Sequence, residues 1–294
     1  MKTRNQKCEL IEAPLFEGAT RDGTELAYKV IKNEHSKNVA GTFSDYVDCL
    51  KKHSFHYSCN AKNIETVVRK CENVRTHVLN AFRNGSFPII IGGDHSVAMS
   101  SIAAGSETFG IDDYCVIYID GHADINTDKT SSSHNIHGMP LASSLGLCDD
   151  ELRIGPLKQK LLGKNIYILG ARSIDEPEYK IIEDNNVRLY KNDCFFEKFD
   201  DILDTIKTEI GNKKVHISFD VDVLDPQYFV STGYLMEKGL SIKAVESIID
   251  FAFQNLDVVS FDIVEYNPLL DNNSADLNTV VNFIKRVENY IYNK

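Results

Sequence analysis

The sequence predicts a three-layer α/β/α protein with a mainly parallel central sheet of about eight strands. Short apolar runs recur along the chain, and most of them are continuous rather than alternating with polar residues. Continuous runs indicate strands that are covered on both faces, which is typical of parallel sheets. Segments with helical spacing separate the runs, so strands and helices alternate. Such alternation requires crossover connections, which place helices on both faces of the sheet.

Seven apolar runs are expected to form strands because they are short and bounded by polar or turn-forming residues. They are Glu9–Ala13, Phe87–Ile91, Tyr114–Ile119, Asn165–Leu169, Val187–Tyr190, Lys214–Phe219 and Val258–Ile263. Apolar residues spaced by three and four predict amphipathic helices. The clearest of these helices are Ile64–Phe82, Ile242–Ala252 and Leu277–Ile291.

The rest of the chain limits the organisation of the protein. The polar stretch His35–Asn63 is expected to be a loop that contains a short helix. No linker rich in Pro, Gly or Ser divides the sequence, so residues 1–294 are expected to form one domain.

The composition excludes several classes of function. A hydrophobic fraction of 43% with 26% charged residues is typical of a globular protein. The net charge of −11 argues against binding to nucleic acid or to anionic membranes. No apolar run approaches the ~20 residues that span a bilayer, and the N-terminus does not resemble a signal peptide. The seven scattered cysteines are expected to be reduced thiols, so a cytoplasmic protein without nucleic-acid or membrane partners is predicted.

Three acidic and histidine-containing segments are the most informative part of the sequence. They are Gly92–Ser96, Asp120–Asn126 and Ser218–Pro226, and each directly follows a predicted strand. Ligands of parallel sheets bind beyond the carboxyl ends of the strands, so these segments are expected to meet there. Carboxylates crowded in this way repel one another unless a cation lies between them.

The spacing of these residues suits metal binding. Alternate residues of an extended backbone share a face, which would align Asp120, His122 and Asp124, and likewise Asp220 and Asp222. Oxygen and imidazole ligands without thiolate favour a divalent ion such as manganese, and two ions that share carboxylates can hold a hydroxide. The predicted metal ligands are His95, Asp120, His122, Asp124, Asp220 and Asp222.

Each segment taken alone has a simpler interpretation. An Asp-x-Asp pair in a loop usually shapes a turn or caps a helix, and a lone buried histidine is usually a core residue. Three such segments at three strand ends favour the metal site. Asp94 and Asp225 are instead assigned to turns, where each is expected to accept hydrogen bonds from nearby backbone.

These segments resemble the signature motifs of the ureohydrolase family, which comprises arginases, agmatinases, formiminoglutamases and their relatives. Ser133–Pro140, Gly170–Asp175 and Asp262–Pro268 extend the resemblance. Within the family, the run Asp124–Thr127 with the following Ser133–Gly138 is most similar to arginase. The resemblance implies an arginase-like fold and a homo-oligomer, either a trimer or a hexamer.

The resemblance also implies a role for each residue of the site. One Mn(II) ion would be held by His95, Asp120, Asp124 and Asp220, and a second by Asp120, His122, Asp220 and Asp222. The catalytic residues would be Asp124, which relays a proton, His137, which shuttles protons to solvent, and Glu265, which pairs with the guanidinium. The substrate's α-carboxylate and α-ammonium would be contacted by Asn126, Ser133, Asn135 and Asp175.

The function predicted in this way is hydrolysis of L-arginine to L-ornithine and urea by a metal-bridging hydroxide. One alternative is another ureohydrolase, acting on agmatine or a guanidino acid, and a second is a weakly active metal-binding regulatory relative. Tyr234 stands where arginases usually carry a threonine, and Ser173 where they often carry an acid. His134 stands in place of a common glycine. Tyr234 favours the first alternative, and the intact ligand set argues against the second.

Overall fold

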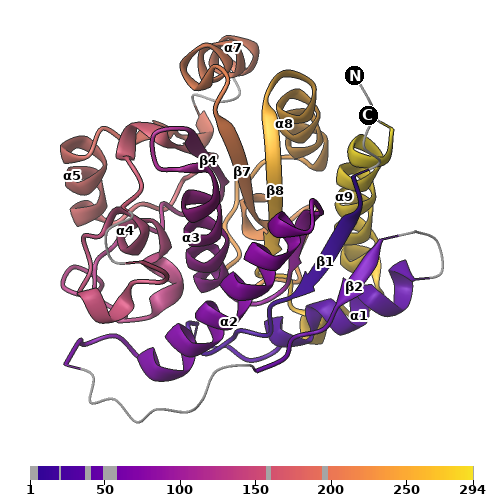
Figure 1. Ribbon diagram of the computed structural model, residues 1–294, viewed down its shortest axis with the longest axis horizontal. Helices are drawn as coiled ribbons and strands as arrows, with labels where there is room; N and C mark the ends of the chain where they lie inside the picture. The colour runs from indigo at the N-terminus through magenta and orange to yellow at the C-terminus, as the bar shows by residue number, and fades with distance from the viewer. Residues whose placement is uncertain are drawn as a thin grey trace.

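A central sheet of eight strands runs through the protein (Figure 1). The computed structural model describes residues 6–19, 21–36, 41–48, 58–156, 160–193 and 198–293. The strand order is β2-β1-β3-β8-β7-β4-β5-β6, and all pairs of neighbours are parallel. The expected α/β architecture is confirmed, and the sheet is entirely rather than mainly parallel.

Seven of the eight strands match the apolar runs of the sequence to within one residue at each end. The strands are β1 (Cys8–Glu12), β2 (Thr42–Ser44), β3 (Phe87–Ile91), β4 (Tyr114–Ile119), β5 (Ile166–Leu169), β6 (Arg188–Tyr190), β7 (Lys214–Asp220) and β8 (Asp257–Val264). The strand without a predicted counterpart, β2, is short and lies at the sheet edge, where its residues are only partly covered. It therefore lacks the continuous apolar run that marks the inner strands.

The stretch His35–Asn63 differs from expectation in the part that is described. It contributes the edge strand β2 and, among its described residues beyond the end of the first helix, no helix of its own. Thr42–Ser44 pair with β1, while residues 37–40 and 49–57 lie outside the described residues, so the expected short helix stays a prediction there. Cys49, like Cys194, lies outside the described residues, and the five described cysteines are free thiols.

Helices cover both faces of the sheet. One face carries α1 (Ala27–His35), α7 (Phe199–Ile210), α8 (Ile242–Asn255) and α9 (Ala275–Tyr292). The other face, seen in front in Figure 1, carries α2 (Ile64–Arg83), α3 (Ala98–Phe109), α4 (Pro140–Leu145) and α5 (Glu176–Asp184). The three helices expected from apolar spacing are confirmed as α2, α8 and α9. Among the described helices, none combines the length and apolarity needed to cross a bilayer.

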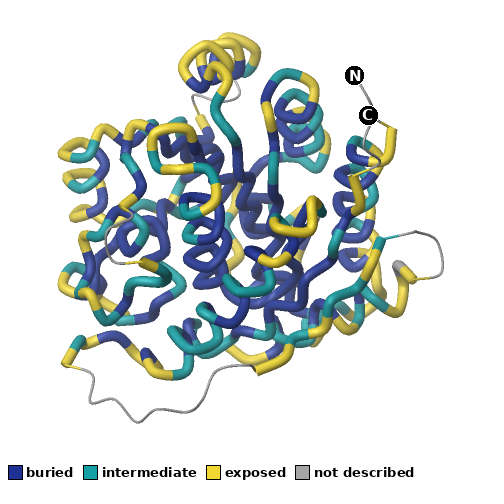
Figure 2. Tube along the Cα trace, in the orientation of Figure 1, coloured by how far each residue is buried: buried dark blue, intermediate teal, exposed yellow. Residues whose placement is uncertain are grey.

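The core lies in two layers separated by the sheet. Successive strand residues point to opposite faces, so Ile89 and Ile91 pack on the α1 side while Ile90 packs on the α2 side. Each of these side chains is fully buried, which contributes roughly 1.5–3 kcal/mol per residue. The buried centre and exposed outer helix turns are visible in Figure 2. The adjacent strands β3, β8, β7 and β4 thus form a rigid base for the loops at their carboxyl ends.

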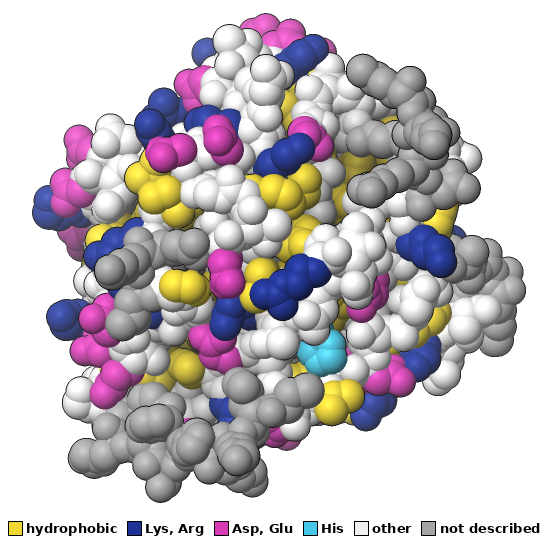
Figure 3. Space-filling view, viewed as in Figure 1, with side chains coloured by type: hydrophobic (Ala, Val, Ile, Leu, Met, Phe, Trp, Pro, Cys, Tyr) yellow, Lys and Arg dark blue, Asp and Glu magenta, His cyan; other side chains and the backbone are white. Residues whose placement is uncertain are grey.

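The surface carries charges of both signs. On the face shown in Figure 3, acidic and basic side chains are interspersed among polar and apolar ones. The net charge of −11 is therefore not concentrated in one patch on this face.

Candidate metal centre

The three acidic segments meet at the carboxyl edge of the sheet. His95 follows β3, Asp120 follows β4, and Asp220 ends β7. The turn before His95 depends on two glycines, since Gly92 and Gly93 have φ angles of 87° and 88°. A Cβ atom on Gly93 would also lie 2.6 Å from a backbone oxygen. Glycine is required there because other residues rarely adopt this conformation and the space is filled.

Two neighbouring aspartates shape turns, as the sequence predicts. Asp94 accepts hydrogen bonds from the backbone N–H groups of Ser96, at 3.0 Å, and Gly18, at 2.9 Å. Asp225 accepts from the N–H groups of Gln227, at 3.0 Å, and Gly239, at 2.9 Å. Both carboxylates are engaged with backbone.

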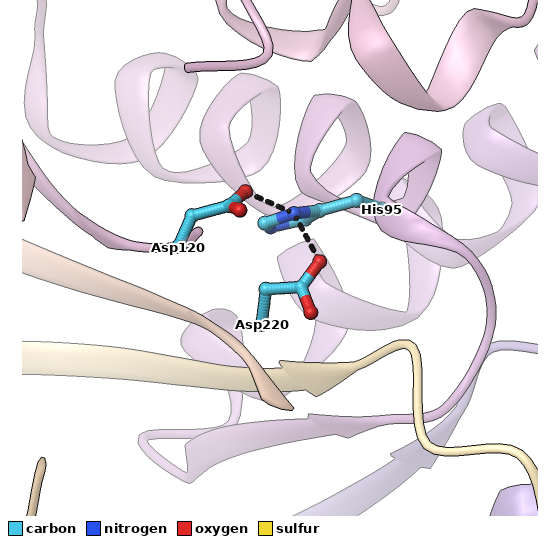
Figure 4. Close-up of side chains that lie close together, drawn as sticks. All are labelled: His95, Asp120 and Asp220. Atoms are coloured by element: carbon cyan, nitrogen blue, oxygen red, sulfur yellow. Dashed lines mark ion pairs between the residues drawn. The ribbon is translucent and has the colours of Figure 1, made fainter. Parts of the chain in front are cut away.

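The first cluster is built around His95 (Figure 4). The imidazole Nδ1 lies 2.9 Å from Asp120 Oδ2, 3.1 Å from Asp220 Oδ2 and 3.2 Å from Asp124 Oδ2. All four residues are buried. Three carboxylates and one imidazole nitrogen therefore face a common point.

The second cluster shares Asp120 with the first. His122 Nδ1 lies 2.9 Å from Asp222 Oδ2 and 3.5 Å from Asp120 Oδ1. Backbone amides hold these carboxylates in place, since Asp222 accepts from Gly121 N at 3.1 Å and Asp120 accepts from His122 N at 2.6 Å. The six expected metal ligands are thus brought together in two adjoining groups.

The backbone geometry that produces this arrangement differs from the expected one. The strand β4 ends at Ile119, and Asp124 has a φ of 48°, in the left-handed region. Asp222 lies in a short 3-10 helix that follows β7. The side chains therefore converge through turns rather than through alternation along an extended strand.

The donor set of the two clusters fits divalent metal ions. His95 Nδ1 and Asp120 Oδ2 are buried, and neither makes a hydrogen bond of standard geometry within the described residues. Burial and the neighbouring carboxylates of Asp222 and Asp120 raise the pKa of Asp220 well above its usual range. A cation between these groups would satisfy the open atoms and offset the repulsion.

Two further side chains, neither of them predicted from the sequence, hold the His95 half of the site. His95 Nε2 lies 2.9 Å from Ser218 Oγ. The ring of Tyr118 stacks on the His95 imidazole with centroids 4.3 Å apart, and its hydroxyl donates to Asp124 Oδ2 at 2.9 Å. A signal exists in hindsight, because Tyr118 and Ser218 each precede a predicted ligand by two residues and so share its face of the strand.

A cavity of about 220 Å³ opens beside the clusters. His137 and Glu265 line it, with His137 Nδ1 at 3.1 Å from Glu265 Oε1. The same oxygen accepts a hydrogen bond from His95 N at 3.0 Å, which ties Glu265 to the first cluster. Burial opposes protonation of His137, but Glu265 and more distant carboxylates outweigh it and raise the pKa of His137 to about 9.

The expected substrate-binding residues are only partly gathered in this cavity. Asn126, Ser133 and Asp175 line it, and Asn126 donates to Asp175 Oδ2 at 2.9 Å. Asn135 lies outside the lining: it is 3% exposed, and its side-chain oxygen accepts from Lys62 at 3.3 Å. Glu178 was missed, although Asp175 and Glu178 have the spacing of a capping box, which they form at the start of α5.

The unusual residues of the sequence also lie here. Tyr234 is 41% exposed and lines the cavity, with its ring centroid 5.8 Å from that of His122 and 5.6 Å from that of His137. Ser173 lines the cavity as well. His134 has a φ of 57°, so it holds the left-handed conformation that favours glycine.

Comparison with known proteins identifies the family. The family model described as the arginase family matches residues 6–287. The chain belongs to the arginase family. The match spans nearly the whole length of the sequence and includes both clusters and the cavity.

Individual relatives agree with this assignment. The chain is 29% identical to an arginase from Bacillus subtilis over 287 residues, which cover 94% of this chain and 95% of the relative. The solved arginase structure from Bacillus caldovelox has a TM-score of 0.86 at 25% identity and covers 98% of this chain and 99% of its own. A proclavaminate amidino hydrolase from Streptomyces clavuligerus shares the fold, with a TM-score of 0.75 at 22% identity, covering 98% of this chain and 92% of its own.

Membership establishes the general chemistry. The arginase family consists of binuclear metal hydrolases that act on guanidino substrates. Histidine and aspartate side chains of the two clusters line the cavity of this chain. The family resemblance that the sequence motifs indicate is therefore confirmed.

Proposed function

We propose that this arginase-family protein hydrolyses L-arginine to L-ornithine and urea with two Mn(II) ions. The observation that carries the proposal is the convergence of six ligand side chains beside a cavity that also presents Glu265 and His137. Open atoms on His95 and Asp120 support the metal, and the Glu265 carboxylate supports a cationic substrate.

The ligand sets follow the two clusters. His95, Asp120, Asp124 and Asp220 would hold one ion, and Asp120, His122, Asp220 and Asp222 the other. When bound, a pair of divalent ions lowers the pKa of a shared water and so supplies a nucleophile at neutral pH.

The residues of the chain orient the guanidinium and move its protons. Glu265 carries a carboxylate close to the first cluster, where it would accept charge-assisted hydrogen bonds from the guanidinium. Asp124 stands between that cluster and the cavity and would pass a proton to the leaving amine. His137 contacts Glu265 and lines the cavity, which suits exchange of that proton with solvent.

The amino-acid end of the substrate would lie farther along the cavity. Asp175 would pair with the α-ammonium, while Asn126 and Ser133 would bind the α-carboxylate. A site that hydrogen-bonds these groups discriminates strongly against an analogue that lacks them. Agmatine keeps the ammonium but lacks the α-carboxylate, so the contacts from Asn126 and Ser133 favour arginine over agmatine.

A second candidate is a ureohydrolase for a different guanidine. Tyr234 fills space beside His122 and His137, and Asn135 faces Lys62 rather than the cavity. Both features reduce the resemblance to an arginine pocket while leaving the metal clusters intact. A regulatory role without turnover would not require the complete ligand set. We also propose a single domain over residues 1–294, since no linker rich in Pro, Gly or Ser divides the sequence, and a cytoplasmic location, which suits the scattered cysteines. The family resemblance supports a homotrimer or hexamer.

A substrate comparison tests the proposed function. Protein loaded with Mn(II) is assayed for urea release from arginine, agmatine and guanidinobutyrate, with Asp120→Ala as the control. Urea from arginine, lost in the Asp120→Ala variant, is the expected result. Urea from another guanidine alone would select the second candidate, and no urea from any substrate would contradict both.

A further inference from the structure

Tyr118 makes two contacts with the first cluster at once. It lies on β4 and is fully buried. Its ring is stacked on His95, with an interplanar angle of 7°, and its hydroxyl reaches Asp124 Oδ2 at 2.9 Å. Asp124 Oδ2 is also the atom that lies 3.2 Å from His95 Nδ1. One side chain therefore fixes two expected ligands relative to each other.

The carboxylate of Asp124 needs such support because the backbone of a regular strand does not fix its orientation. The residue lies beyond the end of β4, and its φ of 48° is unusual for a residue with a side chain. Its backbone oxygen accepts from Leu141 N at 3.1 Å, which fixes the main chain, not the carboxylate. The Tyr118 hydroxyl supplies the contact that orients the carboxylate.

His95 is held from two directions. Tyr118 covers one face of the imidazole, and Ser218 Oγ lies 2.9 Å from Nε2 at its edge. With a cation in the cluster, Nδ1 must present a lone pair, so Nε2 carries the proton and donates to Ser218. Rotation of the ring would lose both contacts.

We propose that Tyr118 is a positioning residue for the His95 half of the metal centre, holding His95 by its ring and Asp124 by its hydroxyl. The inference rests on the metal centre of the proposed function and concerns the ion that Asp124 would bind. The other half is held separately, since Asp222 accepts from Gly121 N. Loss of the Tyr118 hydroxyl therefore weakens one ion site and spares the other.

Two variants of Tyr118 separate its two contacts. Tyr118→Phe keeps the ring on His95 and removes only the hydroxyl, while Tyr118→Leu removes both. The matched control is Tyr114→Phe: Tyr114 lies on the same strand and face, is equally buried, and its hydroxyl is 3.5 Å from the backbone oxygen of Ser101.

The test is a Mn(II) binding isotherm of each variant, without substrate. In Tyr118→Phe, the affinity for one of two ions is expected to fall by about 10- to 100-fold while the other is unchanged. The Mn(II) affinity of Tyr118→Leu is expected to fall further, and that of Tyr114→Phe is expected to stay unchanged. Saturating Mn(II) is expected to restore most of the kcat of Tyr118→Phe, which a general loss of folding would not permit.

Several results would overturn the inference. Unchanged affinity in Tyr118→Phe would do so, and so would an equal loss in Tyr114→Phe, because removal of any buried hydroxyl would then suffice. If the unaltered protein binds two ions but releases no urea, the proposed function fails while the isotherms still decide the role of Tyr118. If the unaltered protein binds no ion, the metal centre and the inference fall together.

Discussion

At the scale of single residues, the His137–Glu265 pair shows how the site tunes its groups. The two side chains lie 3.1 Å apart in a largely buried setting. Their contact outweighs the cost of burial and raises the pKa of His137 to about 9, from an ordinary value of 6.5. The histidine is therefore charged in the metal-free fold at neutral pH, and Glu265 has a cationic partner before any substrate arrives.

This pair predicts a pH-dependent stability. Because the pKa of His137 is higher in the folded than in the unfolded protein, protonation of His137 stabilises the fold. This contribution is fully present below about pH 6.5 and is lost as the pH rises through about 9. In metal-free protein, His137→Asn should cost on the order of 3 kcal/mol near pH 6, where the partner carboxylates are ionised, and progressively less toward pH 9. Urea unfolding of both proteins at several pH values measures this difference. A difference that stays constant with pH would contradict the assignment.

Tyr234 leads to a prediction about substrate affinity. Its ring lies beside His137 at the guanidinium end of the cavity, where an aromatic face can contact a cation. Tyr234→Thr should raise KM for every guanidino substrate by a similar factor, roughly 2- to 30-fold. Tyr234→Phe should behave like the unaltered protein. A change in the ratio of arginine to agmatine turnover would show instead that Tyr234 selects the substrate.

At the scale of elements, the sequence reveals most where the pattern is continuous. The six inner strands are predictable because burial on both faces demands uninterrupted apolar runs. The edge strand β6 is only partly covered, but it lies within the short run Val187–Tyr190 that the sequence marks. The edge strand β2 and the helix α3 escape this logic. The strand β2 is only partly covered. The helix α3 is buried on nearly all sides, and its own residues there include small ones such as Ser100 and Ala104, so it lacks an exposed polar face.

The site divides in the same way. Ligand residues could be predicted because they occur in short motifs at strand ends. Tyr118, Ser218 and Glu178 could not be assigned, since their roles depend on contacts between segments far apart in the chain or on turns after the strands. The position of Asn135 likewise depends on its contact with Lys62 from another segment.

The turn between β3 and α3 gives an element-scale prediction. In Gly93→Ala, the alanine would have to adopt a left-handed φ, and its Cβ would lie 2.6 Å from the backbone oxygen of Ala13. The substitution should therefore destabilise the protein by about 2 kcal/mol or more. Gly85→Ala is the control: its φ is 72°, but no atom lies within 4 Å of the added Cβ, so about 1 kcal/mol is expected. Denaturant unfolding compares the two, and equal costs would refute the packing argument.

At the scale of the whole molecule, the sheet gathers negative charge at one edge. Four clustered aspartates and Glu265 lie close together in a chain whose net charge is already −11. Folding without a counter-charge must overcome this repulsion. Ions that bind only the folded state would stabilise it by mass action, about 2.7 kcal/mol at 100 times Kd.

Metal stoichiometry is the most direct test of the central claim, that these clusters form a dinuclear centre. The metal-to-protein ratio is measured after Mn(II) loading and removal of free ions, together with Tm. We expect two ions per chain and a raised Tm for the unaltered protein. Asp120 belongs to both clusters, so Asp120→Asn should lose both ions, whereas Asp222→Asn should lose one. A ratio near zero in the unaltered protein, or one unaffected by Asp120→Asn, would contradict the account.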